Sequence, residues 1–447
     1  MKQDTLELTI EKPIFGGAGL ARHEGQVVFV DGGLPGSTVM ARITKAEKSC
    51  LHAVAQEVIT PSPLAAEPFC PHFGECGGCT WQNASYEAQL AWKREIVQEQ
   101  MRRIGRIEIE VPPVAASPLT RFYRNKMEFA FGPGTGAGPV LGLHKRHEPT
   151  KILEIETCFL MPEPAVAILE AVRAFARASG LPVYSPKTRE GVWRFLVLRH
   201  SEISGDWLVQ LIVGPKADLA RLHPLGETLS KTFPMVTSVT LGLRSDRSEY
   251  AIAESRGWSL GTGVLEERLD GMRFKVSAES FFQTNTQAAE LLAAAVVDAA
   301  ALTGSEVVWD LYSGCGGLSL PLARKAGSVV GFEANRQAVA DARESVALNN
   351  LENCRFVPGD LKDAVPKRKG RPDVVVLDPP RAGIHPDTLA LLTQMAPARI
   401  VYVSCNPSTL ARDLGRLKET YDVAAITPVD LFPHTYHVEC VATLVRR

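Results

Sequence analysis

The sequence of 447 residues lacks the features that mark membrane, secreted and strongly charged proteins. No apolar run is long enough to span a bilayer, and the polar residues after Met1 do not resemble a signal peptide. Lys and Arg number 49 against 50 Asp and Glu, so neither sign of charge is in excess. Bulk charge therefore does not indicate a nucleic-acid partner, and any such binding must depend on local basic patches.

The nine cysteines are odd in number and scattered, which argues against a disulfide framework and for a reducing compartment. We therefore expect a cytoplasmic protein. A hydrophobic content of 45% and a charged content of 22% are ordinary for a soluble globular protein. A chain of this length is expected to form about two to four domains.

The order of strands, turns and helices predicts three domains. Residues 1–63 contain short strands separated by glycine turns, which is typical of a small β-barrel of the oligonucleotide-binding type. Residues 64–270 mix strands and helices in an α+β pattern. Strands and helices alternate over 271–447, which indicates an α/β domain with a doubly wound, mostly parallel sheet.

Cys405 occupies an informative position in the last domain. It follows an apolar strand, Ile400 to Ser404, and Ser408 and Thr409 offer N-caps for a helix that runs to Leu417. Ligands bind at the carboxyl ends of strands in open α/β sheets, and a helix N-terminus is expected to stabilise a nucleophilic thiolate. The alternative is a buried structural cysteine.

A glycine-rich turn in the same domain predicts a cofactor site. The strand 306–310 leads into a loop in which Gly314 and Gly316 allow close approach of the backbone to a ligand. Glu333 ends the next strand, 19 residues after Gly314, at a spacing suited to a ribose hydroxyl. Asp360 and Asp378 end two further strands. A dinucleotide oxidoreductase has a similar turn, but the loop here is not G-x-G-x-x-G and resembles the S-adenosylmethionine loop of class I methyltransferases.

Three cysteines stand within ten residues in the central part of the chain, at Cys70, Cys76 and Cys79. Clustered cysteines in a cytosolic protein are more often metal ligands than free thiols. Cys158 is a candidate fourth ligand. Four thiolates suit either a structural zinc ion or an iron–sulfur cluster, and spacing alone does not separate the two.

Basic residues gather in local patches, several of them mixed with aromatic residues as in surfaces that contact phosphates and stack bases. A solvated protein face is the alternative for each patch taken alone. The patches comprise Lys93, Arg94, Arg102, Arg103 and Arg106 on or just after a helix expected over 85–104, the segment from Arg121 to Lys151, and Lys367, Arg368, Lys369 and Arg371.

Four motifs, in this order, resemble those of the RNA uracil-5-methyltransferase family. They are Phe281-Phe282-Gln283-Thr284-Asn285, Asp378-Pro379-Pro380-Arg381, Ser404-Cys405-Asn406-Pro407 and Phe432-Pro433-His434-Thr435-Tyr436-His437-Val438-Glu439. The N-terminal barrel looks like the TRAM domain of that family. The four cysteines match those that hold a [4Fe-4S] cluster in its 23S ribosomal RNA branch.

The resemblance implies a role for each matching residue. Cys405 would be the nucleophile that adds to uracil C6, and Glu439 the base that removes the C5 proton. Contacts to S-adenosylmethionine would come from Gln283, Tyr312, Glu333, Asp378 and Asp360. Gly317 departs from the family pattern, which often has a polar residue there. His434 and His437 are expected to be structural or to orient the substrate rather than to bind metal.

We therefore expect formation of 5-methyluridine in RNA, with 23S ribosomal RNA as the substrate, by a monomer that binds neither DNA nor membrane. The same reaction on transfer RNA is the alternative, although that branch usually lacks the barrel and the cysteine cluster. A non-catalytic iron–sulfur protein that binds RNA is an alternative of another class, and the presence of both Cys405 and Glu439 argues against it.

Overall fold

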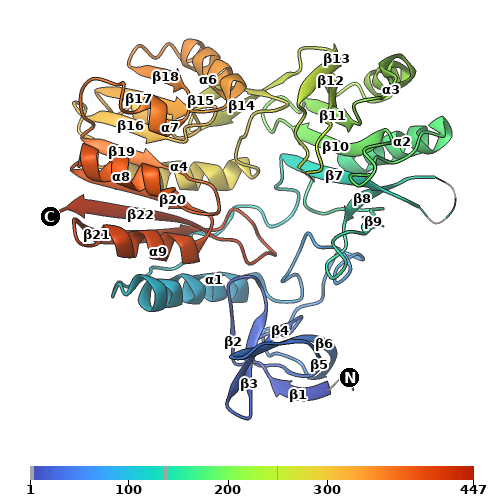
Figure 1. The fold of residues 1–447 in the computed structure, drawn as a ribbon, viewed down its shortest axis with the longest axis horizontal. Helices are drawn as coiled ribbons and strands as arrows, with labels where there is room; N and C mark the ends of the chain where they lie inside the picture. Colours follow the sequence, from blue (N-terminus) through green and yellow to red (C-terminus); the bar gives the residue numbers. More distant parts are fainter. Residues whose placement is uncertain (1–4, 135, 137, 249) are drawn as a thin grey trace.

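A computed structural model of the protein describes residues 5–134, 136, 138–248 and 250–447 (Figure 1). The N-terminal residues form a six-stranded sheet with the order β1-β5-β6-β4-β3-β2. Alternate apolar side chains close its interior, with Leu8, Val28 and Val39 fully or nearly fully buried. The strands are β1 (Thr5–Thr9), β2 (Lys12–Pro13), β3 (Gly19–His23), β4 (Gln26–Asp31), β5 (Thr38–Ala46) and β6 (Cys50–Thr60).

The central part of the chain forms a seven-stranded sheet with the order β13-β12-β11-β10-β7-β8-β9. Its middle strands, β10 and β11, are buried along almost their whole length because both faces are covered, one of them by α2 (Pro164–Ser179) and α3 (Leu219–Thr232). The strands are β7 (Lys126–Gly132), β8 (Val140–His144), β9 (Ile152–Glu154), β10 (Trp193–His200), β11 (Trp207–Val213), β12 (Val236–Leu243) and β13 (Ser255–Leu260).

The C-terminal part confirms the predicted α/β domain. Its seven-stranded sheet has the order β18-β17-β16-β19-β20-β22-β21, in which the first five strands are parallel and β21 and β22 antiparallel. The strands are β16 (Val307–Leu311), β17 (Ser328–Glu333), β18 (Cys354–Pro358), β19 (Val374–Leu377), β20 (Arg399–Ser404), β21 (Tyr421–Val429) and β22 (Glu439–Arg446).

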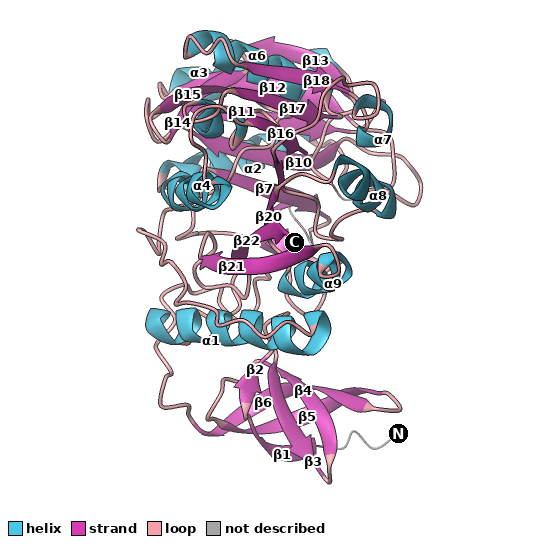
Figure 2. Ribbon diagram, turned by 90° about the vertical axis from the view of Figure 1, so that its left-hand side faces the viewer, coloured by secondary structure: helices cyan, strands magenta, loops and turns pink. Residues whose placement is uncertain are grey.

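Helices cover both faces of this C-terminal sheet, so each face has its own apolar core. Figure 2 shows α4 and α6 on one side of the sheet and α7, α8 and α9 on the other. The helices are α4 (Thr286–Ala300), α5 (Ser319–Ala323), α6 (Arg336–Leu348), α7 (Leu361–Ala364), α8 (Pro386–Met395) and α9 (Pro407–Leu417). None of the helices within the described residues is both long enough and apolar enough to cross a bilayer.

A hairpin of β14 (Val264–Leu269) and β15 (Met272–Ser277) joins the central and C-terminal sheets. Leu269 and Phe274 pack into the C-terminal core, together with residues of α4. The boundary predicted after Asp270 falls inside the turn of this hairpin. The structure therefore places the start of the C-terminal unit before β14.

One long helix, α1 (Tyr86–Gln100), lies between the barrel and the C-terminal sheet in both views (Figures 1 and 2). A π-helical turn, η1 (Met101–Gly105), continues it, and together they occupy the helix expected over 85–104. Val97 and Met101 are buried in the C-terminal core. Residues of the predicted central domain therefore form part of the support for the C-terminal sheet.

Candidate active site

Cys405 and Glu439 meet at the carboxyl edge of the C-terminal sheet. Cys405 follows β20, and Glu439 begins β22, the antiparallel neighbour of β20. The ladder pairs Ser404 with Cys440, so the same register continued by one residue sets Cys405 opposite Glu439. The pairing joins two residues that lie in separate motifs of the sequence, and it places a thiol beside a carboxyl.

The helix after Cys405 is capped by a different residue from those expected. Asn406, rather than Ser408 or Thr409, is the N-cap of α9, and its side-chain oxygen accepts from the backbone N–H groups of both residues at 3.0 and 3.4 Å. Pro407 occupies the first helical position, where no N–H is needed. Because the cap precedes Pro407 directly, Cys405 lies immediately before the N-cap.

The surroundings of Cys405 raise the pKa of its thiol to about 11, mainly because burial disfavours the thiolate and also because of the charges of Glu439 and Asp378. Arg381 opposes this shift. Any stabilisation of the thiolate by the helix N-terminus is therefore outweighed by burial and the nearby acids. Burial likewise raises the pKa of Glu439 and of Asp378, so the site favours protonated groups in the free protein.

Two residues of this edge were not among the predicted site residues. Arg381 follows Asp378 in the Asp-Pro-Pro-Arg motif, and its charge favours the thiolate of Cys405. Asp310 ends a predicted strand; it is buried, its pKa is raised to about 7 by burial, and it accepts a hydrogen bond from Ser319 Oγ at 2.5 Å. The position of Asp310 directly before the glycine loop could have identified it as a site residue from sequence.

Two cavities adjoin the glycine-rich loop, and Tyr312 lines both of them. The larger measures about 640 Å³ and is lined by Glu333 and Asp360, among others. The smaller measures about 50 Å³ and is lined by Gln283 and Asp378 together with the loop. The predicted cofactor residues thus line two cavities that share Tyr312.

The glycine loop is fixed by Glu333, whose carboxylate accepts from Gly314 N at 2.9 Å and from Asn335 N at 2.7 Å. Gly314 and Gly316 have φ angles of 54° and 91°, which side chains rarely adopt. At Gly317 a Cβ atom would meet nothing within 4 Å, so the missing side chain leaves space in the smaller cavity.

The remaining cofactor residues differ in how they are held. Asp360 is exposed, and its carboxylate caps α7 by accepting from Lys362 N at 3.1 Å. The backbone carbonyl of Gln283 accepts from Asn125 Nδ2 at 2.9 Å, which ties its motif to the central domain. Tyr312 has a φ of 72°, and its hydroxyl is 3.1 Å from Thr388 Oγ1.

The segment that carries Glu439 is anchored on α1 by a buried ion pair. Lys93 Nζ is 2.7 Å from Asp430 Oδ1, and both side chains have no exposed surface. Lys93 also donates to the carbonyl of Phe432 at 3.0 Å, and Tyr86 donates to Asp430 Oδ2 at 2.9 Å. The position of Lys93 among other basic residues predicted a surface patch that could contact RNA. Because its side chain is buried, Lys93 does not belong to such a patch.

His434 is a structural residue in this segment. Its Nε2 is 2.9 Å from the carbonyl oxygen of Thr120 and therefore donates, while Nδ1 accepts from Gln89 Nε2 at 3.3 Å. Burial lowers the pKa of His434 to about 4, so the ring is neutral. Both nitrogens are engaged, which supports the expectation that His434 does not bind metal. The pKa of His437 is lowered in the same way, also to about 4.

The predicted cysteine ligands lie between the central sheet and the segment just described. Burial raises the pKa of Cys76 to about 11 and of Cys79 to about 12, and the other thiols of the group act on both in the same direction. Gly78 N donates to Cys76 Sγ at 3.4 Å, and the backbone of Leu160 and Met161 bonds to the thiol of Cys158.

Hydrogen bonds tie the loop of Cys70, Cys76 and Cys79 to both neighbours. Gly77 N donates to the carbonyl of His144, at the end of β8, at 3.0 Å. Thr80 N and Trp81 N donate to the carbonyl of His434 at 2.8 and 2.9 Å. The four predicted ligands therefore come together at a junction, with Cys158 contributed from a distant part of the chain.

A third cavity of about 850 Å³ opens beside the cysteine loop. Its wall combines residues of the barrel, the central sheet and the segment that carries Glu439. The aromatic side chains of Phe281 and Tyr436 are among them. Its basic residues come from the patch predicted over Arg121 to Lys151, namely Arg124, Lys126, Lys145 and Arg146. Phe281 is 60% exposed, unusual for an aromatic side chain.

Comparison with known proteins identifies two domains. The profile of the family described as tRNA (Uracil-5-)-methyltransferase matches residues 262–447, and that of the TRAM domain matches residues 1–55. An uncharacterized RNA methyltransferase of Nitratidesulfovibrio vulgaris is 43% identical over 457 aligned positions, which cover 98% of this chain and 96% of the relative. Another, from Caldanaerobacter subterraneus, is 36% identical and covers 99% of both chains.

A solved structure resembles the whole chain. The crystal structure of Pyrococcus abyssi tRNA (uracil-54, C5)-methyltransferase in complex with S-adenosyl-L-homocysteine superposes with a TM-score of 0.76 at 28% identity. The match covers 98% of this chain and 100% of that one. By its end-to-end similarity to these relatives, its C-terminal profile match and its N-terminal TRAM domain, the chain belongs to the RNA uracil-5-methyltransferase family.

Proposed function

We propose that the protein methylates C5 of uracil in RNA with S-adenosylmethionine, and that its substrate is 23S ribosomal RNA. The observation that supports the reaction most directly is the register that sets the Cys405 thiol opposite the Glu439 carboxyl. The sheet brings these two groups together beside the cavities over the glycine loop. A nucleophile and a base are the two functions that this chemistry needs.

In the proposed reaction Cys405 Sγ forms a bond to uracil C6, and the C5–C6 π electrons become an enolate at C5. Carbon C5 then takes the methyl group from the sulfonium, which leaves as S-adenosylhomocysteine. Glu439 removes the C5 proton, the electrons of that bond re-form the double bond, and the C6–S bond breaks. Arg381 favours the thiolate, whereas burial and the nearby acids oppose it, so formation of the thiolate is coupled to binding.

The residues around the two cavities that share Tyr312 suit S-adenosylmethionine. Glu333 presents a carboxylate where a ribose would hydrogen-bond, and Asp360 and Tyr312 line the same cavity of about 640 Å³. Gln283 and Asp378 line the smaller cavity, where the acid would lie close to the positive sulfonium. A bound cation would lower the raised pKa of Asp378, because it removes part of the repulsion among the acids.

The four cysteines suit a [4Fe-4S] cluster. Among the described residues, only Glu47, Cys50 and His52 bring three ligand atoms within 4.8 Å of one another, so the four thiols are spread more widely. Thiolates on a tetrahedral zinc ion are about 3.8 Å apart, given Zn–S bonds of about 2.3 Å. A cluster with a thiolate on each iron spans more, and backbone N–H groups that face Cys76 and Cys158 would stabilise the ionised sulfurs.

RNA would bind along the cavity of about 850 Å³, which is lined by four basic side chains, two aromatic rings and residues of the barrel. Transfer RNA is the second candidate, because the Pyrococcus abyssi enzyme described as acting on tRNA matches over its full length. Because that match covers 98% of this chain, the presence of the N-terminal barrel does not separate the two substrates. In either RNA a paired uracil must be flipped out to reach the thiol.

The test is methyl transfer to unmodified 23S ribosomal RNA and, separately, to an unmodified transfer RNA pool, with S-adenosylmethionine labelled in the methyl group. Mass mapping of the digests should place 5-methyluridine in the ribosomal RNA and not in the transfer RNA. Label in transfer RNA alone would replace the proposed substrate. Cofactor binding without transfer to either RNA would reject the enzymatic proposal.

A further inference from the structure

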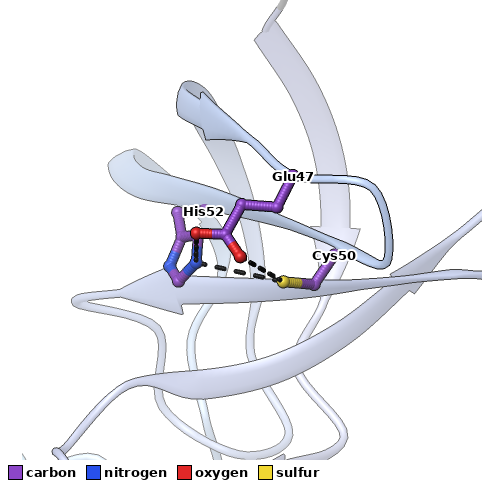
Figure 3. A group of neighbouring side chains, drawn as sticks. All are labelled: Glu47, Cys50 and His52. Carbon is purple, nitrogen blue, oxygen red and sulfur yellow. Dashed lines mark hydrogen bonds and ion pairs between the residues drawn. The ribbon is translucent and has the colours of Figure 1, made fainter.

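A second group of metal-ligating side chains lies on the TRAM barrel, away from the four cysteines and from Cys405. Glu47, Cys50 and His52 stand at the tip of the hairpin formed by β5 and β6 (Figure 3). Glu47 N donates to the carbonyl of Cys50 at 2.9 Å and closes the turn. Cys50 and His52 are two residues apart on β6, so both side chains point to the same face of the strand.

The ligand atoms of this group are close to the spacing that a single ion requires. Cys50 Sγ is 3.8 Å from Glu47 Oε2 and 4.0 Å from His52 Nε2, and His52 Nε2 is 3.7 Å from Glu47 Oε1. With ordinary bond lengths, a tetrahedral zinc ion sets sulfur about 3.6 Å from nitrogen or oxygen, and nitrogen about 3.4 Å from oxygen. Each observed distance exceeds the required one by only a few tenths of an ångström, although the sulfur and the nitrogen approach different oxygens of Glu47. One ligand atom from each residue lies within 4.8 Å of the other two.

From this geometry we propose that Glu47, Cys50 and His52 form a binding site for Zn²⁺ or a similar divalent cation, with the fourth position open to water. A thiolate, an imidazole and a carboxylate together suit zinc better than the oxygen-preferring Mg²⁺ or Ca²⁺. The group is partly exposed, with 42% of the His52 side chain and 41% of the Glu47 side chain accessible, so an ion can enter from solvent.

Lys45 would compete with the metal ion for the carboxylate of Glu47. Its Nζ is 2.6 Å from Glu47 Oε1, on the carboxylate that the ion would use, and this contact lowers the pKa of Glu47. Bound metal would displace the ammonium group from this oxygen. The register pairs Lys45 with His52 across the hairpin, so its position is fixed by the same two strands that form the site. Removal of Lys45 should therefore strengthen metal binding.

The experiment is a titration of full-length protein, purified without oxygen and with its iron content measured, with Zn²⁺ by calorimetry and with Co²⁺ by absorption. Wild type should bind one metal ion that Cys50→Ser and His52→Ala lose, and Co²⁺ should give tetrahedral bands with a sulfur-to-metal charge-transfer band. Lys45→Ala should bind about fivefold more tightly, the effect of removing a unit charge close by in a solvated site.

The matched control is His23→Ala, which removes a histidine from the neighbouring hairpin of the same barrel, between β3 and β4, and should leave the metal bound. Circular dichroism of each variant checks that the barrel is folded. Equal metal binding by wild type and Cys50→Ser would overturn the proposal, as would octahedral Co²⁺ bands in the wild type. The comparison holds whatever the other four cysteines bind, because those are unchanged in every variant.

Discussion

Cys405 and Cys76 are half-buried thiols whose pKa is raised to about the same value, 11, yet their surroundings differ in kind. Beside Cys405 stand two acids and one arginine. Beside Cys76 stand other thiols and a backbone N–H group that donates to its sulfur. Burial is the main cause of the raised pKa in both places, and the nearby acids or thiols add to it. The two sites differ in the cation that would stabilise the thiolate when the protein is active.

Under the proposed function, the cation near Cys405 is temporary and the one near Cys76 is permanent. The sulfonium of a bound cofactor would reduce the repulsion among the acids near Cys405 only while it is present. Iron would hold the thiolate of Cys76 throughout the life of the folded protein. A catalytic thiol that ionises only in the complex remains protected from side reactions, and a structural thiolate does not need that protection.

The largest expected effect is at Cys405. Cys405→Ala should abolish methyl transfer and form no covalent complex with RNA, because no other group can add to C6. Glu439→Gln should also lose turnover, but it should stop after methylation with RNA still bound through sulfur, because the C5 proton cannot leave. A denaturing gel with labelled RNA should show a shifted, protease-sensitive band for Glu439→Gln alone.

Wild-type protein with RNA that contains 5-fluorouridine is the positive control for this gel, because fluorine cannot leave as a proton does. It should give the same shifted band. Methylation of natural RNA without any fluorinated adduct would contradict covalent catalysis. An adduct in Cys405→Ala would transfer the role to another thiol, with the buried Cys315 and Cys440 as the next candidates.

The second effect is at Cys76. Wild-type protein purified without oxygen should be brown and contain about four irons per chain, the content of one [4Fe-4S] cluster. Cys76→Ser should lose most of the iron and part of the soluble yield, because the loop joins the central sheet to the catalytic segment, while cofactor affinity should change little. Cys50→Ser is the matched control and should keep its iron. Stoichiometric zinc in place of iron would reject the cluster.

The third effect tests the ion pair that supports the segment shared by both thiol sites. Lys93→Met leaves Asp430 buried without its cation and should lower the free energy of unfolding by about 3–5 kcal/mol. Lys216→Met removes an exposed pair with Glu190 and should cost about 0–1 kcal/mol. Urea denaturation of the two variants gives the comparison. Equal costs would mean that the buried pair is not important for anchoring the segment.

The sequence predicted elements well where local pattern decides them. The apolar run Ile400 to Ser404 was predicted as a strand and lies within β20 (Arg399–Ser404), where its side chains are buried. The comparisons confirm the family assignment. The assignment could be made from sequence because the motifs lie in short local segments.

Features that depend on distant partners could not be predicted in this way. Lys93 reads as one more surface cation in a basic helix, and its partner Asp430 lies 337 residues away. The pKa of Cys405 is raised by burial and by acids that come from distant parts of the sequence. The position of Cys405 next to a helix N-terminus therefore did not predict the direction of the shift. The cap at Asn406 was missed because Asn406, Ser408 and Thr409 are all residue types that cap helices, and they lie within four residues.

The smallest expected effect is at Glu267, which tests how burial raises a pKa at a residue with no predicted catalytic role. Glu267 is 3% exposed, its Oε2 has no hydrogen-bond partner among the described residues, and burial together with Glu202 raises its pKa to about 8. The folded protein therefore keeps a proton that the unfolded chain releases near pH 4.5. Stability from this group is complete at low pH and is lost as the pH rises towards 8.

Glu267→Gln cannot ionise and should remove this dependence. Its free energy of unfolding relative to wild type should improve by about 1–3 kcal/mol between pH 5 and pH 8, since each unit of pKa shift corresponds to about 1.4 kcal/mol. Glu190→Gln, an exposed carboxyl, is the control and should show no such trend. A flat difference between wild type and Glu267→Gln across this range would mean that Glu267 ionises normally. Burial alone would then be too weak to raise a carboxyl pKa in this fold, and the raised pKa values at Cys405 and Cys76 would have to depend on their neighbouring charges.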